Sequence, residues 1–151
     1  MFSKACEYGI RATIYIAWNT TNDKRVNLKQ ISKEIGSPEA FTAKILQQLV
    51  RSEVITSVKG ASGGFTLNTA TAPSLMLSTL VAAIDGDTIY RGCGLGLKSC
   101  NSKKPCPMHG QFMLVREQLR EMLENTSIND LLDDYGDGRT YLNRLSTTQQ
   151  N

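Results

Sequence analysis

The chain has 151 residues, of which 40% are hydrophobic, 7% are aromatic and 21% are charged, and its formal net charge is +3. This length fits one globular domain with a small appendage, and the composition excludes a fully disordered chain. No apolar stretch is long enough to span a bilayer, and the N-terminus lacks the features of a secretory signal. We therefore expect a cytoplasmic protein that has no membrane partner and whose four cysteines are reduced thiols or metal ligands.

The net charge is distributed unevenly along the chain. Residues 1–65 carry nine Lys and Arg against five Asp and Glu, a net charge of +4, whereas residues 66–110 carry +2 and residues 111–151 carry −3. A basic N-terminal half can face phosphate groups, but a difference of this size also arises from ordinary variation among surface residues. The charge distribution alone therefore does not identify a binding partner.

A first helix is predicted from Ser3 to Trp18, because apolar residues recur there at helical spacing and Ser3 is a suitable N-cap. Cys6 lies among the apolar positions, so we interpret it as a small buried core residue. The polar residues Thr20–Asp23 then predict a turn.

Two further helices follow closely. Asn27 and Gln30 have the spacing of a capping box and Gly36 is typical of a helix end, which predicts a short helix over 28–35. Ser37, as a capping residue, followed by proline and glutamate predicts the start of a third helix over 38–52. Two helices joined by so tight a turn form a helix-turn-helix, although the same pattern also occurs in ordinary helical hairpins.

The third helix has two chemically different faces. Its apolar face comprises Phe41, Ile45, Leu46, Leu49 and Val50. The opposite face carries short residues, amides and cations, which can approach bases, pair with base edges and reach phosphates. An ordinary solvated helix face is the alternative. This face comprises Ala40, Lys44, Gln47 and Arg51, flanked by Ala43 and Gln48.

A β-hairpin is predicted next. Val54–Val58 is rich in β-branched residues, Phe65–Leu67 alternates, and the glycine-rich segment 59–64 lies between them. Glycines allow positive φ and let the backbone and Lys59 lie against a phosphate backbone or a narrow groove. The segment lacks the Gly-Lys-Ser/Thr ending of a nucleotide-binding P-loop. A hairpin placed directly after a recognition helix is a wing.

The C-terminal half contains helices separated by an irregular loop. A core helix is predicted over 74–84, and residues 87–110 form a loop rich in glycine, proline and cysteine. A long helix is predicted over 111–124, where the heptad-like stripe of Phe112, Val115, Leu119 and Met122 indicates a dimer contact or packing on its own domain. A short capped segment, Ile128–Leu132, precedes a polar tail that we expect to be mobile from Gly136 onward.

The loop holds a complete set of four metal ligands. Cys93, Cys100 and Cys106 are separated by wide gaps, and His109 follows the last cysteine by three positions. Thiolates and imidazole suit an iron–sulfur cluster or zinc, and the wide gaps are less typical of structural zinc sites, whose cysteines are usually closer together. Thiol redox chemistry and a chance grouping remain open alternatives.

The hairpin and the loop together resemble the iron–sulfur-sensing winged-helix regulators typified by IscR and NsrR, also called the Rrf-two type. The resemblance covers about residues 2–135 and rests on Tyr8–Ala12, on Ile31-Ser32 with Gly36, on Val58–Phe65 and on the three-cysteine loop. It implies a mainly α fold with a small β-hairpin, in which a winged helix-turn-helix domain is followed by a long C-terminal dimerisation helix. The implied parts are a DNA-binding domain over 1–86, a cluster-binding loop over 87–110, dimerisation and terminal helices over 111–135 and a flexible tail over 136–151.

The resemblance also implies a homodimer that binds a palindromic operator in double-stranded DNA as a transcriptional regulator, with repression as the expected activity. Major-groove contacts fall on Ala40, Ala43 and Lys44, and minor-groove contact falls on Lys59. Ala43 replaces an acidic residue of some members, and Lys59 replaces an arginine of some, which weakens shape-specific groove contact. The candidate DNA-contacting residues are Ser37, Ala40, Ala43, Lys44, Gln47, Gln48, Arg51, Lys59, Gly60 and Ser62.

Similarity to IscR implies that Cys93, Cys100, Cys106 and His109 bind a 2Fe–2S cluster, with a 4Fe–4S cluster as the other possibility. In the NsrR branch an acidic residue of the first helix, supplied by the partner subunit, is the fourth ligand. Glu7 occupies that position here and is the alternative to His109. The sequence contains no recognisable catalytic motif, so we expect no enzymatic activity. The competing functions are a winged-helix regulator that uses thiol redox or zinc, and a small electron-transfer protein.

Overall fold

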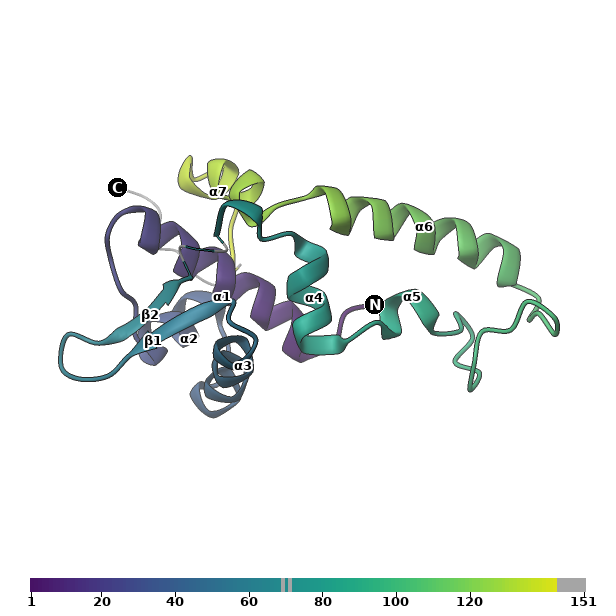
Figure 1. The fold of residues 1–151 in the computed structure, drawn as a ribbon, viewed down its shortest axis with the longest axis horizontal. Helices are drawn as coiled ribbons and strands as arrows, with labels where there is room; N and C mark the ends of the chain where they lie inside the picture. The colour runs from purple at the N-terminus through teal and green to yellow at the C-terminus, as the bar shows by residue number, and fades with distance from the viewer. Residues whose placement is uncertain (69, 71, 144–151) are drawn as a thin grey trace.

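The computed structural model describes residues 1–68, 70 and 72–143 and is mainly helical, with one two-stranded antiparallel sheet (Figure 1). This confirms the predicted fold class. In chain order the elements are α1 (Lys4–Thr21), α2 (Leu28–Ile35), α3 (Glu39–Arg51), β1 (Ile55–Val58), β2 (Gly64–Leu67), the 3-10 turn η1 (Ala72–Ser74), α4 (Leu77–Asp85), α5 (Thr88–Arg91), α6 (His109–Asn125) and α7 (Ile128–Gly136).

Helix α1 is the centre of the core and contacts α2, α3, α4, α7 and β2. The predicted N-cap is confirmed, since the Ser3 hydroxyl accepts from the backbone N–H of Cys6 (3.0 Å). The helix continues to Thr21, so the prediction of a turn from Thr20 is wrong and the turn begins at Asn22. The Thr20 hydroxyl donates to the carbonyl of Ile16 (2.8 Å), which satisfies this polar side chain inside the helix.

Helices α2 and α3 form the predicted helix-turn-helix. Asn27 and Gln30 make the full capping box, and Gly36 ends α2 in the left-handed region at φ 66°. The capping role predicted for Ser37 is wrong, because Pro38 occupies the N-cap position and α3 begins at Glu39 with no side-chain cap. The hydroxyl of Ser37 is buried and has no hydrogen-bond partner among the described residues.

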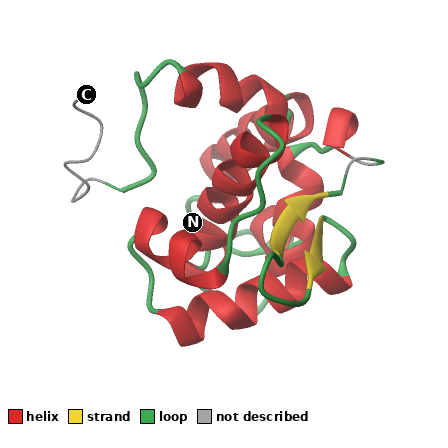
Figure 2. Cartoon of the chain, turned by 90° about the vertical axis from the view of Figure 1, so that its left-hand side faces the viewer, coloured by secondary structure: helices red, strands yellow, loops and turns green. Residues whose placement is uncertain are grey.

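The predicted hairpin is confirmed, with register pairs from Ile55–Leu67 to Val58–Gly64. The chain between α1 and α2 lies along the free edge of β2, where Val26 and Phe65 exchange backbone hydrogen bonds of 3.3 and 2.8 Å. Figure 2 shows the two strands beside the helical core. Backbone pairing on this edge fixes the wing to the start of the helix-turn-helix.

Helix α4 is shorter than the predicted helix over 74–84. It starts at Leu77, because Met76 has an extended backbone and forms a bridge with Ser127 of the α6–α7 connection. Leu77 N–H donates to the carbonyl of Thr126 (2.9 Å), and Ile128 N–H donates to that of Leu75 (2.9 Å). These contacts join segments far apart in sequence, which local periodicity does not reveal.

The segment over 87–110 was predicted to be loop throughout, and this prediction is wrong. The segment contains the short helix α5, and its last two residues, His109 and Gly110, already belong to α6. Helix α6 has one fully buried residue, Leu123 near its C-terminal end. Its N-terminal part extends away from the winged domain toward the tip of the cysteine loop (Figure 1).

Helix α7 is longer than the predicted segment Ile128–Leu132 and packs back on α1. Tyr135 meets Trp18 edge to face and donates its hydroxyl to Glu34 (2.9 Å). Part of the segment predicted to be a mobile tail packs on the domain, since Leu142 is buried and its carbonyl accepts from Arg11 (3.1 Å); the mobility of the tail stays a prediction. Residues 144–151 lie outside the described part of the chain.

Candidate DNA-binding face and metal centre

The predicted outward face of α3 is exposed. Ala40, Lys44, Gln47 and Arg51 lie at the surface and Ala43 is half-buried, while Ile45, Leu46 and Leu49 anchor the opposite face in the core. A helix whose apolar side is locked into a packed core holds its polar side in a fixed direction. The exposed residues therefore form a rigid surface of short, amide and cationic side chains.

Two of the predicted DNA-contacting residues, Gln48 and Ser37, are not presented at this surface. The Gln48 amide donates to the carbonyls of Ala83 (3.0 Å) and Ile84 (3.3 Å) near the end of α4. Ser37 is buried. We therefore omit both residues from the DNA-contacting set that we propose below, since neither side chain is presented to a ligand.

The wing tip exposes Lys59, Gly60 and Ser62. Gly60 has φ +105°, and the N–H of Gly63 donates to its carbonyl (3.0 Å). A Cβ at Gly63 would lie 2.1 Å from the carbonyl oxygen of Val58, so the turn closes only around glycine. The compact turn holds Lys59 at the exposed end of the hairpin.

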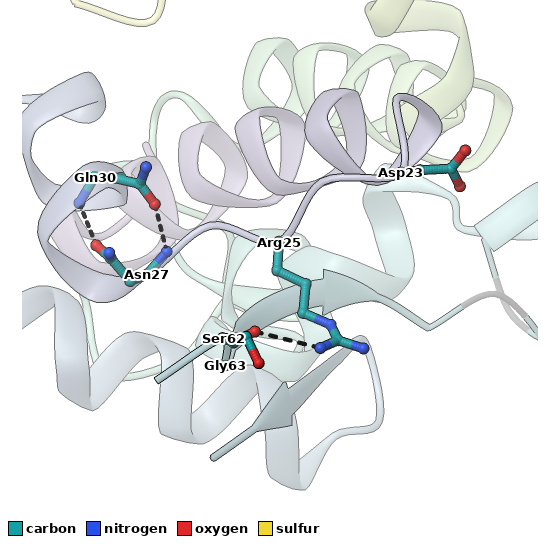
Figure 3. Close-up of a pocket in the computed structure, with 6 residues that line it drawn as sticks. All are labelled: Asp23, Arg25, Asn27, Gln30, Ser62 and Gly63. Atoms are coloured by element: carbon teal, nitrogen blue, oxygen red, sulfur yellow. Dashed lines mark hydrogen bonds between the residues drawn. The ribbon is translucent and has the colours of Figure 1, made fainter. Parts of the chain in front are cut away.

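Arg25 supports the wing from the neighbouring connection, and sequence reasoning missed it. Its guanidinium donates to the carbonyl of Ser62 (3.3 Å), as Figure 3 shows. The available signal was its place in a basic pair, Lys24-Arg25, next to the helix-turn-helix.

The structure places the four predicted ligands in two close pairs. The sulfurs of Cys93 and Cys106 are 3.9 Å apart, and the sulfur of Cys100 lies 3.3 Å from Nδ1 of His109. All four side chains are partly exposed, and His109 is held by the first turn of α6. Among the described residues, no three Cys, His, Asp or Glu side chains converge on one point as ligands of a single metal ion.

Paired ligands fit a binuclear cluster better than a mononuclear site. A tetrahedral metal ion with metal–sulfur bonds of about 2.3 Å separates two thiolate sulfurs by about 3.8 Å, close to the 3.9 Å between Cys93 and Cys106. Each iron of a 2Fe–2S cluster takes two protein ligands, and histidine can replace cysteine in this role. The donor set and its pairing therefore suit such a cluster.

Arg116 connects the loop to α6, a role that sequence reasoning also missed. Its Nη1 donates to the carbonyls of Gly92 (2.9 Å) and Tyr90 (3.3 Å), and its Nη2 donates to the sulfur of Cys100 (3.1 Å). The signal in the sequence was its position seven residues after His109, which places the two on the same face of the helix. Arg116 thereby positions one cysteine and the end of α5 together.

The thiol environments differ between the loop and the core. Backbone N–H groups of Leu95 and Leu97 donate to the Cys93 sulfur and hold its pKa below the usual value. Burial, with nearby Asp85, raises the pKa of Cys6 to about 12. Cys6 is 0% exposed, so its predicted place in the core is confirmed.

Glu7 lies on α1, where it forms an ion pair with Lys4 (2.9 Å). This contact holds the pKa of its carboxyl below the usual value. Within the described chain Glu7 joins neither ligand pair. Its role as alternative fourth ligand involves a second subunit and remains a prediction.

The predicted stripe on α6 is divided between two environments. Phe112 and Leu119 are half-buried, with Phe112 lying against Gly94 of the loop, whereas Val115 is 49% and Met122 is 47% exposed. The exposed apolar side chains along and just before this helix are Met108, Met113, Leu114, Val115 and Met122.

Among the described residues, none of the helices combines the length and the apolar character that a membrane-spanning segment needs.

A helix-turn-helix followed by a wing, with a long helix that projects beyond the core, defines a winged-helix transcriptional regulator. The family model described as "Rrf2: Iron-dependent Transcriptional regulator" matches residues 2–134. The chain belongs to the Rrf2 family, whose members are transcriptional regulators rather than enzymes.

Individual relatives agree with this assignment. An HTH-type transcriptional regulator of Aquifex aeolicus is 30% identical over 136 residues, which cover 88% of this chain and 92% of that protein. The fold is similar to that of CymR, the global cysteine regulator of B. subtilis, with a TM-score of 0.69, 16% identity and coverage of 88% and 96%. It is equally similar to that of T. potens IscR, with a TM-score of 0.69, 18% identity and coverage of 93% and 91%.

Proposed function

We propose that this protein is an IscR/NsrR-type repressor that senses iron–sulfur cluster status, iron, redox state or nitric oxide through Cys93, Cys100, Cys106 and His109. The observation that carries the proposal is the arrangement of these ligands in two pairs, Cys93 with Cys106 and Cys100 with His109, at 3.9 and 3.3 Å. A bound cluster supplies a group that is sensitive to oxidants and to loss of iron. The pairing favours the 2Fe–2S form.

DNA recognition is assigned to α3 and the wing of each subunit in a homodimer. Ala40, Ala43 and Lys44 read a major groove, Gln47 and Arg51 extend this contact, and Lys59 with Gly60 and Ser62 approaches the backbone or minor groove. Two subunits related by a two-fold axis place two such surfaces on a palindromic operator.

The loop can influence DNA binding through elements that touch it. Arg116 holds Cys100 and the carbonyls at the end of α5, and α6 packs on α4, whose terminal carbonyls hold Gln48 of α3. Two arrangements of the loop would therefore correspond to two positions of α3. Any ligand that favours one arrangement of the loop then shifts the affinity for DNA.

Anaerobic reconstitution with iron and sulfide is expected to yield a protein with cluster absorption and with iron and sulfide in equal amounts. The physical reason is that three cysteines and a histidine, partly exposed, are already held as two close pairs. The measurement is absorption spectroscopy with iron and sulfide analysis, followed by DNA binding by the holo and apo forms. Protein that remains free of iron under these conditions contradicts the sensor proposal.

A second candidate is a winged-helix regulator that uses its thiols directly or binds zinc. The 3.9 Å separation of the Cys93 and Cys106 sulfurs favours it, because a small movement would allow a disulfide. Zinc in freshly isolated protein, or metal-free protein whose DNA binding responds to thiol oxidation, would select this candidate. Binding of neither operator nor arbitrary DNA at low salt would favour the electron-transfer alternative.

Replacing Lys59 by alanine is expected to weaken binding to all DNA sequences alike. One phosphate contact contributes about 0.9 to the slope of log K against log salt, so the slope should become shallower by about that amount. Titrations of a short duplex at several salt concentrations measure this. Arg139→Ala is the control, since it removes one exposed positive charge near the end of α7; an unchanged slope in the Lys59 variant would contradict the wing assignment.

A further inference from the structure

One guanidinium, that of Arg116 on α6, contacts both parts of the cysteine loop. Its Nη1 donates to the carbonyl of Gly92 (2.9 Å), the residue that directly precedes Cys93. Its Nη2 donates to the sulfur of Cys100 (3.1 Å). Cys93 belongs to one ligand pair and Cys100 belongs to the other. Because the guanidinium is rigid and planar, this side chain fixes the position of one pair relative to the other.

The positive charge of Arg116 faces the loop and is not balanced by a carboxylate. Among the described residues, Arg116 forms no ion pair. The segment 88–116 contains five Lys and Arg residues and no Asp or Glu. Four of the five are exposed, where water and salt screen their charge, whereas Arg116 is half-buried and directly contacts a candidate ligand. Its charge therefore acts on the Cys100 sulfur more strongly than the others.

The hydrogen bonds to the sulfurs differ between the two pairs. Backbone N–H groups donate to the Cys93 sulfur, whereas a cation donates to the Cys100 sulfur. Hydrogen bonds from a charged donor are roughly twice as strong as neutral ones. Hydrogen bonds to the ligand sulfurs and net charge are among the factors that set the reduction potential of an iron–sulfur cluster. Since reduction adds one negative charge, a cation at Cys100 stabilises the reduced state.

We propose that Arg116 is a positioning residue of the cluster site and raises the reduction potential of a bound cluster through its hydrogen bond to Cys100. This inference rests on the proposed function and adds a determinant that the four ligands do not supply. Arg116 belongs to α6, so a change in the direction of this helix would move a positive charge relative to the Cys100 sulfur. The oxidant strength to which the regulator responds is then set by a residue outside the ligand set.

Arg116→Gln is the decisive variant. Glutamine retains an amide that can donate a hydrogen bond but removes the positive charge. In the anaerobically reconstituted protein, the equilibrium constant for one-electron reduction should fall about tenfold, which is a shift of about 59 mV to lower potential. Potentiometric titration with dithionite as the reductant, followed by cluster absorption, measures this shift. Arg116→Lys keeps the charge and should shift the potential by less than half as much.

Arg120→Gln is the matched control, because it removes one positive charge from the next turn of α6. The Arg120 guanidinium lies over the ring of Tyr90 (5.0 Å) and 3.8 Å from the carboxylate of Glu117. The potential of this variant should equal that of the wild type. Equal shifts in Arg116→Gln and Arg120→Gln would overturn the proposal, since net charge alone would then explain both. A wild-type potential in Arg116→Gln, or a shift in Arg116→Lys as large as that in Arg116→Gln, would also overturn it.

The positioning role can be measured in the metal-free protein. The N–H groups of Gly92 and Gly96 donate to nearby backbone carbonyls (2.8 and 2.9 Å), and such bonds slow amide hydrogen exchange. If Arg116 holds this segment to α6, both amides should exchange faster in Arg116→Gln. Exchange in α1 should not change, which separates loosening of the loop from unfolding of the core. Unchanged exchange at both glycines would overturn the positioning role.

Failure of this inference is distinguishable from failure of the proposed function. Wild-type protein that takes up no cluster overturns both, whereas a wild-type cluster whose potential does not depend on Arg116 overturns this inference alone. If Arg116→Gln takes up no iron, Arg116→Met removes the same charge with a side chain of similar length. Loss of iron in both variants would show that Arg116 is required for cluster assembly rather than for the potential, and would overturn the proposal. A lower potential in Arg116→Gln but not in Arg120→Gln, with faster exchange at Gly92 and Gly96, supports it.

Discussion

Cys106→Ala is expected to abolish cluster binding. It removes one thiolate of the closest ligand pair and leaves Cys93 as the only protein ligand on that side of the loop. A metal site that loses one of four ligands keeps little affinity, because the free position opens to water and to competing thiols. After anaerobic reconstitution, the iron content of the variant should fall below about a tenth of the wild-type value, and the DNA affinity should stop responding to oxidants.

The control for this experiment is Cys6→Ala. It removes a thiol that is completely buried in the core and lies on α1, outside both ligand pairs. The variant should be somewhat less stable, since a small cavity costs about 1 kcal/mol, yet it should retain iron and cluster absorption. Iron retention by Cys106→Ala equal to that of Cys6→Ala would refute the assignment of Cys106 as a ligand.

The winged core could be predicted from the sequence because its signals are local. The capping box of Asn27 and Gln30, the left-handed Gly36 and the glycine-rich tip each act within a few residues, and all three have the expected structure. Apolar periodicity likewise identified the buried face of α3. The local signal at Ser37 gave the wrong N-cap, because the proline that follows occupies this position instead.

The remaining features depend on contacts between distant segments. Met76 pairs with Ser127, Val26 pairs with Phe65, and Arg11 reaches the carbonyl of Leu142. No periodicity in one segment reports its partner in another, so the start of α4, the edge pairing of the wing and the buried Leu142 could not be predicted.

The candidate site shows the same division. Its four ligand types were evident from composition and spacing, but their pairing as Cys93 with Cys106 and Cys100 with His109 depends on the path of the loop. The engagement of Gln48 with the end of α4 was hidden for a related reason, since a helical wheel describes direction and not the carbonyls that a side chain meets. Arg116 and Arg25 were missed because their partners lie in distant segments: Arg25 donates to the carbonyl of Ser62, and Arg116 donates to the carbonyl of Gly92 and to the sulfur of Cys100.

Introducing Val115→Glu together with Met122→Glu is expected to prevent formation of the proposed homodimer. Helix α6 projects from the core, and these two residues form the exposed half of its apolar stripe, at 49% and 47% exposure in the single chain. Association along this stripe would bury the new carboxylates without partners, at a cost of about 4 kcal/mol or more, so dimer affinity should fall about a thousandfold. Sedimentation equilibrium at micromolar concentration measures the change.

Operator binding provides the functional consequence of that loss. Once one subunit of a dimer has bound its half-site, the other subunit binds the second half-site at a high effective concentration, which separate monomers lack. The affinity for a palindromic operator should therefore drop far more than the affinity for a single half-site. Met113→Glu is the control, because residue 113 is exposed on the opposite edge of α6 and should leave the dimer intact. If the dimer survives the double substitution but is lost in Met113→Glu, the subunit contact lies on the other edge of the helix. The direction in which the cysteine loop faces the second subunit would then differ as well.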